Sequence, residues 1–215
     1  YLAARHLAQQ PWEPNLLNKL SWNPAWHPVL VMMAGQIEAP SRLVHLLADR
    51  KRDDLFRPRL ALAILCLREI PAGRRGRAMV DGIVTEGVRL WLFHSRMGTE
   101  AALHRMNGAM KCLAELRGHY RGFPILELVS RSNKWDLFNL VKVCGSAAAT
   151  PAVVSRLVEW LRDPDEDVRS SSASALGKMG DKAATPEVVS RLVECLRDPD
   201  KDVRSSSASA LGKMG

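Results

Sequence analysis

The residues of this 215-residue chain that could take part in catalysis are scattered rather than grouped. Six histidines occur, but none forms a His-Glu or His-x-x-x-His pair, the spacing by which helices hold a catalytic metal. The serine-rich segment 170–174 lacks the Gly-x-Ser-x-Gly turn that activates a nucleophile. Segment 71–77 lacks the Gly-Lys-Ser/Thr ending of a phosphate-binding loop and reads as a basic surface turn. We therefore expect no catalytic, metal-binding or cofactor-binding residue in this chain, and no enzymatic activity.

The four cysteines are also isolated and form no Cys-x-x-Cys motif. Because free cysteine behaves as a small hydrophobic residue, we expect all four to be buried, in a protein of the reducing cytoplasm. The longest apolar runs, 29–34 and 60–67, are shorter than the roughly 18 residues of a membrane span, so no membrane association is expected. The cysteines are Cys66, Cys112, Cys144 and Cys195.

The charge is distributed unevenly along the chain. There are 31 Lys+Arg and 23 Asp+Glu, a net charge of +8, but residues 149–215 hold 10 and 11, a net −1. Residues 1–148 hold the remaining 21 and 12, a net +9, so any polyanion site belongs there. Both a nucleic-acid contact and a solvated loop fit the two short basic clusters. The clusters are Arg50, Lys51 and Arg52, and Arg74, Arg75 and Arg77.

The strongest pattern is an internal repeat. Residues 149–180 and 184–215 align at an offset of 35 and differ at three of 32 positions. A fixed period of this length predicts an array of stacked units, because one unit cannot cover its own apolar face. The three differences are Ala152/Glu187, Trp160/Cys195 and Glu166/Lys201.

Each repeat reads as two helices separated by a turn. Thr150 is a suitable N-cap and Pro151 a suitable first helical residue. The segment Asp163-Pro164-Asp165 ends the first helix, because proline disfavours helix in the residue before it. Gly180 is expected to end the second helix in the left-handed αL conformation. The second helix is predicted to bury one face, formed by Val168, Ser172, Leu176 and Met179.

These units resemble HEAT repeats, of the short kind also seen in phycobilisome-lyase-like proteins. The resemblance lies in Leu161-Arg-Asp-Pro-Asp-Glu-Asp-Val-Arg and Ala175-Leu-Gly-Lys-Met-Gly. It implies an all-α fold, an α-α superhelix or α-solenoid of helix pairs. It also implies polar contacts between repeats, although phosphate binding by Arg169 or Arg204 is an alternative. The implied contact residues are Asp167, Arg169, Asp202 and Arg204.

Residues 1–148 are predicted to form an irregular helical region, and residues 149–215 the two repeats. Helices are expected over 60–70, 79–93 and 101–116. Because Gly145 lies 35 residues before Gly180, residues 125–145 are a candidate degenerate repeat. Five tryptophans are expected to anchor helix packing: Trp12, Trp22, Trp26, Trp91 and Trp135.

A second resemblance covers about residues 1–70. Tyr1-Leu-Ala-Ala is similar to the end of the segment Phe-Gln-Glu-Tyr-Leu-Ala-Ala that follows a NACHT nucleotide-binding core. The Trp-containing segment 20–35, then 53–57 and 60–69, continue the order of features in those proteins. The resemblance implies the C-terminal part of a STAND NTPase whose nucleotide-binding core is absent from this chain.

The expected function is a non-catalytic scaffold or sensor that binds a protein partner. Two alternatives are a nucleic-acid-binding solenoid and an array that self-associates through an uncapped, apolar C-terminal repeat. The partner surface is predicted on the second helices, whose polar side fits a contact surface and a solvated face equally. Trp160, which differs between the repeats, is either part of a variable contact surface or a neutral difference. The helix residues are Ser170, Ser174, Lys178, Ser205, Ser209 and Lys213.

Overall fold

The computed structural model describes residues 1–116 and 133–215, and for residues 77–79 the backbone alone. Every regular element in that part of the chain is a helix, so the fold is all-α, as predicted. The chain divides into two compact units, Tyr1–Gly122 and Phe123–Gly215. No helix in the described ranges has the length and apolar character needed to cross a membrane.

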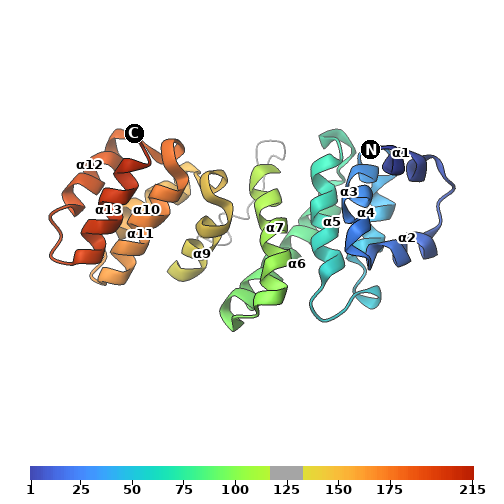
Figure 1. Cartoon of the computed structure of the whole chain (residues 1–215), viewed down its shortest axis with the longest axis horizontal. Helices are drawn as coiled ribbons and strands as arrows, with labels where there is room; N and C mark the ends of the chain where they lie inside the picture. The colour runs from blue at the N-terminus through green and yellow to red at the C-terminus, as the bar shows by residue number, and fades with distance from the viewer. Residues whose placement is uncertain (117–132) are drawn as a thin grey trace. The chain divides into compact units, whose positions relative to one another are not determined.

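The first unit is built around one buried helix, α5 (Figure 1). It packs against α3, α4, α6 and α7, and most of its side chains are buried, because residues 60–67 are apolar on every side. The helices predicted over 60–70, 79–93 and 101–116 are confirmed as α5, α6 and α7. The elements are α1 (Leu2–Gln9), α2 (Pro14–Ser21), η1 (Pro24–Trp26), α3 (His27–Ala34), α4 (Pro40–Ala48), η2 (Arg50–Arg52), α5 (Pro58–Glu69), η3 (Ala72–Arg74), α6 (Arg77–Met97) and α7 (Glu100–Leu116).

The second unit contains the repeats, each a helix pair. Thr150 caps its first helix as predicted: its hydroxyl accepts a hydrogen bond from the Val153 N–H at 3.2 Å. Asp165 caps the second helix by accepting from the Asp167 N–H at 2.9 Å. The elements are α9 (Lys134–Cys144), η4 (Gly145–Ala148), α10 (Pro151–Trp160), α11 (Glu166–Met179), η5 (Gly180–Ala183), α12 (Pro186–Cys195) and α13 (Lys201–Gly212).

The second helices stack side by side, with α11 between α9 and α13 (Figure 1). The predicted inner face of α11 is confirmed, since Val168, Ser172, Leu176 and Met179 are all buried. The αL prediction for Gly180 is wrong. Its φ is +58° but its ψ is −143°, because the chain passes directly from α11 into the short helix η5.

One repeat earlier in the chain, α9 and η4 show the same geometry. Gly145 has φ +54° and ψ −131°, close to the values of Gly180. A Cβ at Gly145 would lie 3.7 Å from the Lys178 carbonyl, and one at Gly180 would lie 3.6 Å from that of Lys213. In the candidate degenerate repeat 125–145, residues 125–132 lie outside the described part of the chain, while α9 occupies the position of a second helix.

The tryptophans range from fully buried to about half-exposed. Trp91 is 1% exposed and donates from Nε1 to Asn107 Oδ1 at 2.9 Å, which joins α6 to α7. Trp22 and Trp135 are more exposed, at 44% and 47%, but each still makes a ring contact: the Arg59 guanidinium lies 5.7 Å from the Trp22 ring, and the Trp135 ring lies edge-on to Phe138 at 5.5 Å. The four cysteines are free and buried as expected, and burial raises the pKa of the Cys112 thiol to about 11.

Candidate interaction surface of the repeats

An arginine–aspartate pair joins the two repeats. Arg169 donates from Nε and Nη2 to the two carboxylate oxygens of Asp198, at 2.8 and 3.0 Å. Its Nη1 donates to the carbonyls of Asp163 and Pro164 in its own turn, at 2.9 and 3.1 Å. Thirty-five residues before each partner, Lys134 of α9 pairs with Asp163. Equivalent contacts therefore link α9 to the turn before α11, and α11 to the turn before α13.

The prediction of the residues that make this contact was only partly correct. Asp167 and Asp202 are exposed in the first turns of α11 and α13, where a negative charge favours the helix dipole, and neither carboxylate forms an ion pair with a described residue. Asp202 does contact the other repeat through its backbone, since its carbonyl accepts from the Ser170 hydroxyl at 3.4 Å. Arg204 donates from Nη1 to the carbonyls of its own turn, Asp198 and Pro199, both at 2.8 Å. A repeat offset identifies equivalent residues but not which of them touch. Lys134 was not predicted as a contact residue. The sequence signal that could have identified it is its position, 35 residues before Arg169.

These ion pairs make the repeats sensitive to acid. Hydrogen bonds from Lys134 and Arg169 hold the pKa values of Asp163 and Asp198 below their ordinary value. A lowered pKa means that the carboxylate stabilises the folded state at neutral pH, and that this contribution is lost as pH falls below about 4. We expect the free energy of unfolding, measured by urea titration between pH 6 and pH 3, to fall less steeply in Asp198→Asn. Identical slopes would contradict this.

The outward side of the second helices forms one polar surface, here called the repeat face. The predicted residues Ser174, Lys178, Ser205, Ser209 and Lys213 are exposed on it. Ser170 is half-buried, and its hydroxyl lies 3.0 Å from that of Ser206 in the next repeat. On α9 the exposed residues of the repeat face are Trp135, Asn139 and Lys142.

Trp160 does not belong to the repeat face. It is 8% exposed, its ring lies edge-on to Phe138 of α9 at 5.5 Å, and the Arg156 guanidinium lies 5.6 Å from it. The partner contact predicted for Trp160 is therefore replaced by packing between repeats. Trp135 was missed as a surface residue, although it lies 35 residues before Ser170.

Three lysines gather at one end of the repeat face. The pKa of Lys178 is lowered, first by partial burial and then by the positive charges of Lys142 and Lys213. None of the three is recorded in an ion pair with a described residue. Like charges held together without a counter-charge favour binding of a carboxylate. The repeat face thus combines hydroxyl donors, an exposed indole and a cationic end.

Three residues of the basic clusters predicted to bind polyanions have partners within the first unit, and the other two with described side chains are exposed. Arg50 pairs with Glu86 at 3.3 Å, and Arg52 pairs with Asp49 at 3.3 Å. Lys51 is exposed in the same turn.

The second basic cluster follows α5 instead of preceding it. Arg75 donates from Nε to the Ile70 carbonyl at 2.6 Å and so completes the end of α5. Arg74 is exposed, and the side chain of Arg77 lies outside the described part. Because α5 has 12 residues, it separates the two clusters by about 18 Å. The structure does not bring them into one patch.

The second unit is an α-solenoid of stacked helix pairs. The family model for HEAT repeats matches residues 124–212, so this part of the chain carries HEAT repeats, as the repeated residues predicted. No curated protein matches the chain. Among the described residues, no group of three or more His, Cys, Asp or Glu side chains could hold a metal ion.

Proposed function

We propose that this chain is a non-catalytic scaffold and sensor segment of a NACHT–HEAT signalling NTPase of the cytoplasm, which binds a protein partner on the repeat face. The HEAT repeats support the scaffold role, since repeat arrays present extended binding surfaces. The similarity of residues 1–70 to the region after a NACHT core supports the parentage.

The repeat face carries the proposal. Its exposed hydroxyls recur at the same positions of successive helices, as Ser174 and Ser209 do, so a partner meets the same group twice along the stack. The lysines Lys142, Lys178 and Lys213 add a positive end, and they indicate a partner with acidic side chains there.

Large side chains on the repeat face should block the partner. We expect the double variant Ser174→Arg and Ser209→Arg to lose about tenfold or more in affinity, because bulky cations would separate the two surfaces. The measurement is affinity capture with the full chain as bait, quantified by mass spectrometry. The matched control is Ser155→Arg with Ser190→Arg, since these serines are also exposed and equivalent but lie on the first helices.

The scaffold role requires a protein that the wild type and the control retain and the face variant does not. Equal capture by all three chains would exclude the repeat face. Retention of DNA or RNA that falls with rising salt would favour the nucleic-acid alternative. ATP turnover that copurifies with the chain would contradict the non-catalytic assignment.

A further inference from the structure

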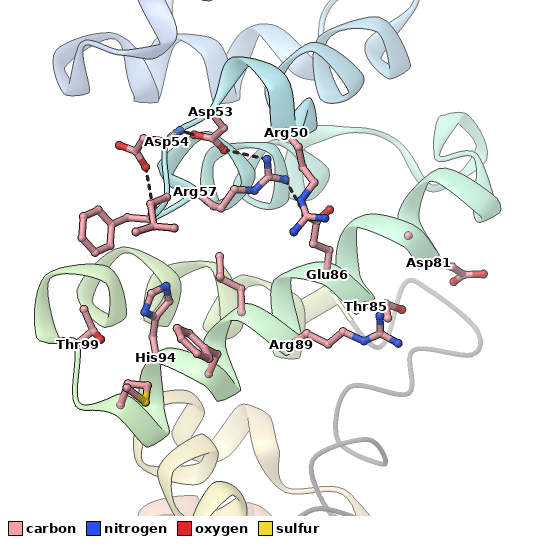
Figure 2. Close-up of a pocket in the computed structure, with 16 residues that line it drawn as sticks. Arg50, Asp53, Asp54, Arg57, Asp81, Thr85, Glu86, Arg89, His94 and Thr99 are labelled. Carbon is pink, nitrogen blue, oxygen red and sulfur yellow. Dashed lines mark hydrogen bonds and ion pairs between the residues drawn. The ribbon is translucent and has the colours of Figure 1, made fainter.

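A groove in the first unit has features that neither the repeats nor the scaffold role explains. It encloses about 1290 Å³ between the segment 50–57 and one side of α6, and it ends at Thr99 (Figure 2). One end is apolar and exposed, and the other is charged. The apolar residues are Leu55, Phe56, Phe93 and Met97, which are 84%, 45%, 56% and 66% exposed.

The loop that forms the upper wall is held in place by a strained residue. Arg57 has φ +52°, a left-handed conformation that no other described non-glycine residue adopts. Such a conformation costs about 1–2 kcal/mol and persists only where surrounding contacts fix it. Here Arg57 Nη2 donates to the Ala48 carbonyl at 3.1 Å and to Glu86 Oε1 at 3.0 Å, which ties the loop to α6 (Figure 2).

Two aspartates fix the rest of the loop. Asp54 Oδ1 accepts from the Phe56 N–H at 2.8 Å. The buried Asp53 carboxylate accepts from the N–H groups of Arg59 and Leu60 at the start of α5, at 3.3 and 3.1 Å. These hydrogen bonds therefore hold the loop in a conformation that exposes Leu55 and Phe56 to solvent.

His94 provides an independent indication of a ligand. It lines the groove from α6 and is 3% exposed, yet neither ring nitrogen has a hydrogen-bond partner among the described residues. Its ring lies 5.3 Å from Phe93 and 6.2 Å from Phe56. An unpaired buried polar group costs about 1–3 kcal/mol, so a bound group that reaches His94 would recover that energy.

The volume and the length of the groove indicate which class of ligand fits it. Pockets for small molecules enclose roughly 300–1,000 Å³, less than this volume. The groove follows α6 from Asp81 to Met97, about 24 Å at 1.5 Å per residue, which matches a helix of about 16 residues. Helices bound in grooves insert apolar side chains spaced three or four residues apart.

The charged end of the groove indicates which charge the bound helix should carry there. Arg50 and Arg57 share Glu86, whereas Arg89 is exposed and has no recorded ion-pair partner in the described part of the chain. We propose that this groove binds an amphipathic helix of a partner protein. Its apolar side chains occupy the space between Phe56 and Phe93, a polar group reaches His94, and a carboxylate pairs with Arg89.

The test is selection from a displayed library of helical peptides of about 16 residues, carrying apolar residues three or four apart and randomised polar positions. The full chain is the bait. We expect enriched peptides to carry Asp or Glu at one position, and to lose about tenfold or more in affinity for Phe93→Ser with Met97→Ser. Val193→Ser is the matched control, because Val193 is a half-exposed apolar residue of the second unit.

Charge reversal gives the sharpest outcome. The variant Arg89→Glu should change the enriched residue from Asp or Glu to Lys or Arg, because the introduced carboxylate would repel an acidic side chain of the peptide. His94→Phe, which keeps an aromatic ring but removes both ring nitrogens, should weaken the peptides about fivefold. The proposal is overturned if peptides bind the Phe93/Met97 variant as well as wild type, if no peptide is enriched, or if Arg89→Glu leaves the preferred charge unchanged.

Discussion

Gly177→Ala is expected to lower the free energy of unfolding of the repeats by about 2 kcal/mol. A Cβ at Gly177 would lie 2.8 Å from Cα and 3.0 Å from Cβ of Ala210, so α11 and α13 would have to move apart. Overpacking of this kind costs about 1–3 kcal/mol, which outweighs the higher helix propensity of alanine. Urea unfolding followed by circular dichroism measures the change.

The second repeat provides the control at the equivalent position. Gly212 lies 35 residues after Gly177, and a Cβ there would have no neighbour within 4 Å. Gly212→Ala should therefore leave stability unchanged or raise it by up to about 0.5 kcal/mol. If both variants lose the same amount, the close approach of α11 to α13 is not what requires glycine at 177.

The second large effect is expected at the inter-repeat ion pair. Arg169→Ala should destabilise the repeats by about 2–3 kcal/mol, because it removes a bidentate, charge-assisted pair that is mostly shielded from solvent. The side chains of Arg169 and Asp198 are 14% and 11% exposed. The same urea titration reports the loss, and Asp198→Ala should reproduce most of it.

The variant Arg204→Ala distinguishes the stability contributed by the Arg169–Asp198 pair from that contributed by the turn contacts. Both arginines donate from Nη1 to two carbonyls of their own turn, but only Arg169 is also recorded with a carboxylate of the next turn. The variant of Arg204 should therefore lose about 1 kcal/mol or less. Equal losses at the two positions would show that the turn contacts, rather than the pair with Asp198, stabilise the stack.

Much of the repeat architecture follows from local sequence. Thr150, Pro151 and the Asp-Pro-Asp turn define each helix pair, because capping, proline geometry and helix dipoles act within a few residues. The inner face of α11 follows from the spacing of Val168, Leu176 and Met179. The conformation of Gly180 was not predictable in this way, since it depends on the η5 turn that follows.

Contacts between distant segments were not predictable from one sequence. The Trp160/Cys195 difference fits both a variable contact surface and a neutral change, and only the structure places Trp160 against Phe138 of α9. The groove depends on Arg57, whose strained backbone is held by Glu86, 29 residues away. Nothing in the segment 53–57 alone requires Leu55 and Phe56 to be exposed, or His94 to be buried without a partner.

Three properties of this protein can be derived from its residues alone: its helices, the 35-residue period of its C-terminal part, and the location of its excess positive charge outside the repeats. They depend on composition and short-range spacing. Three others require the packed structure: the pairing of Arg169 with Asp198, the contact of Gly177 with Ala210, and the groove along α6. The physical reason is that identical residues have different energies according to what packs against them, as Arg169 and Arg204 show.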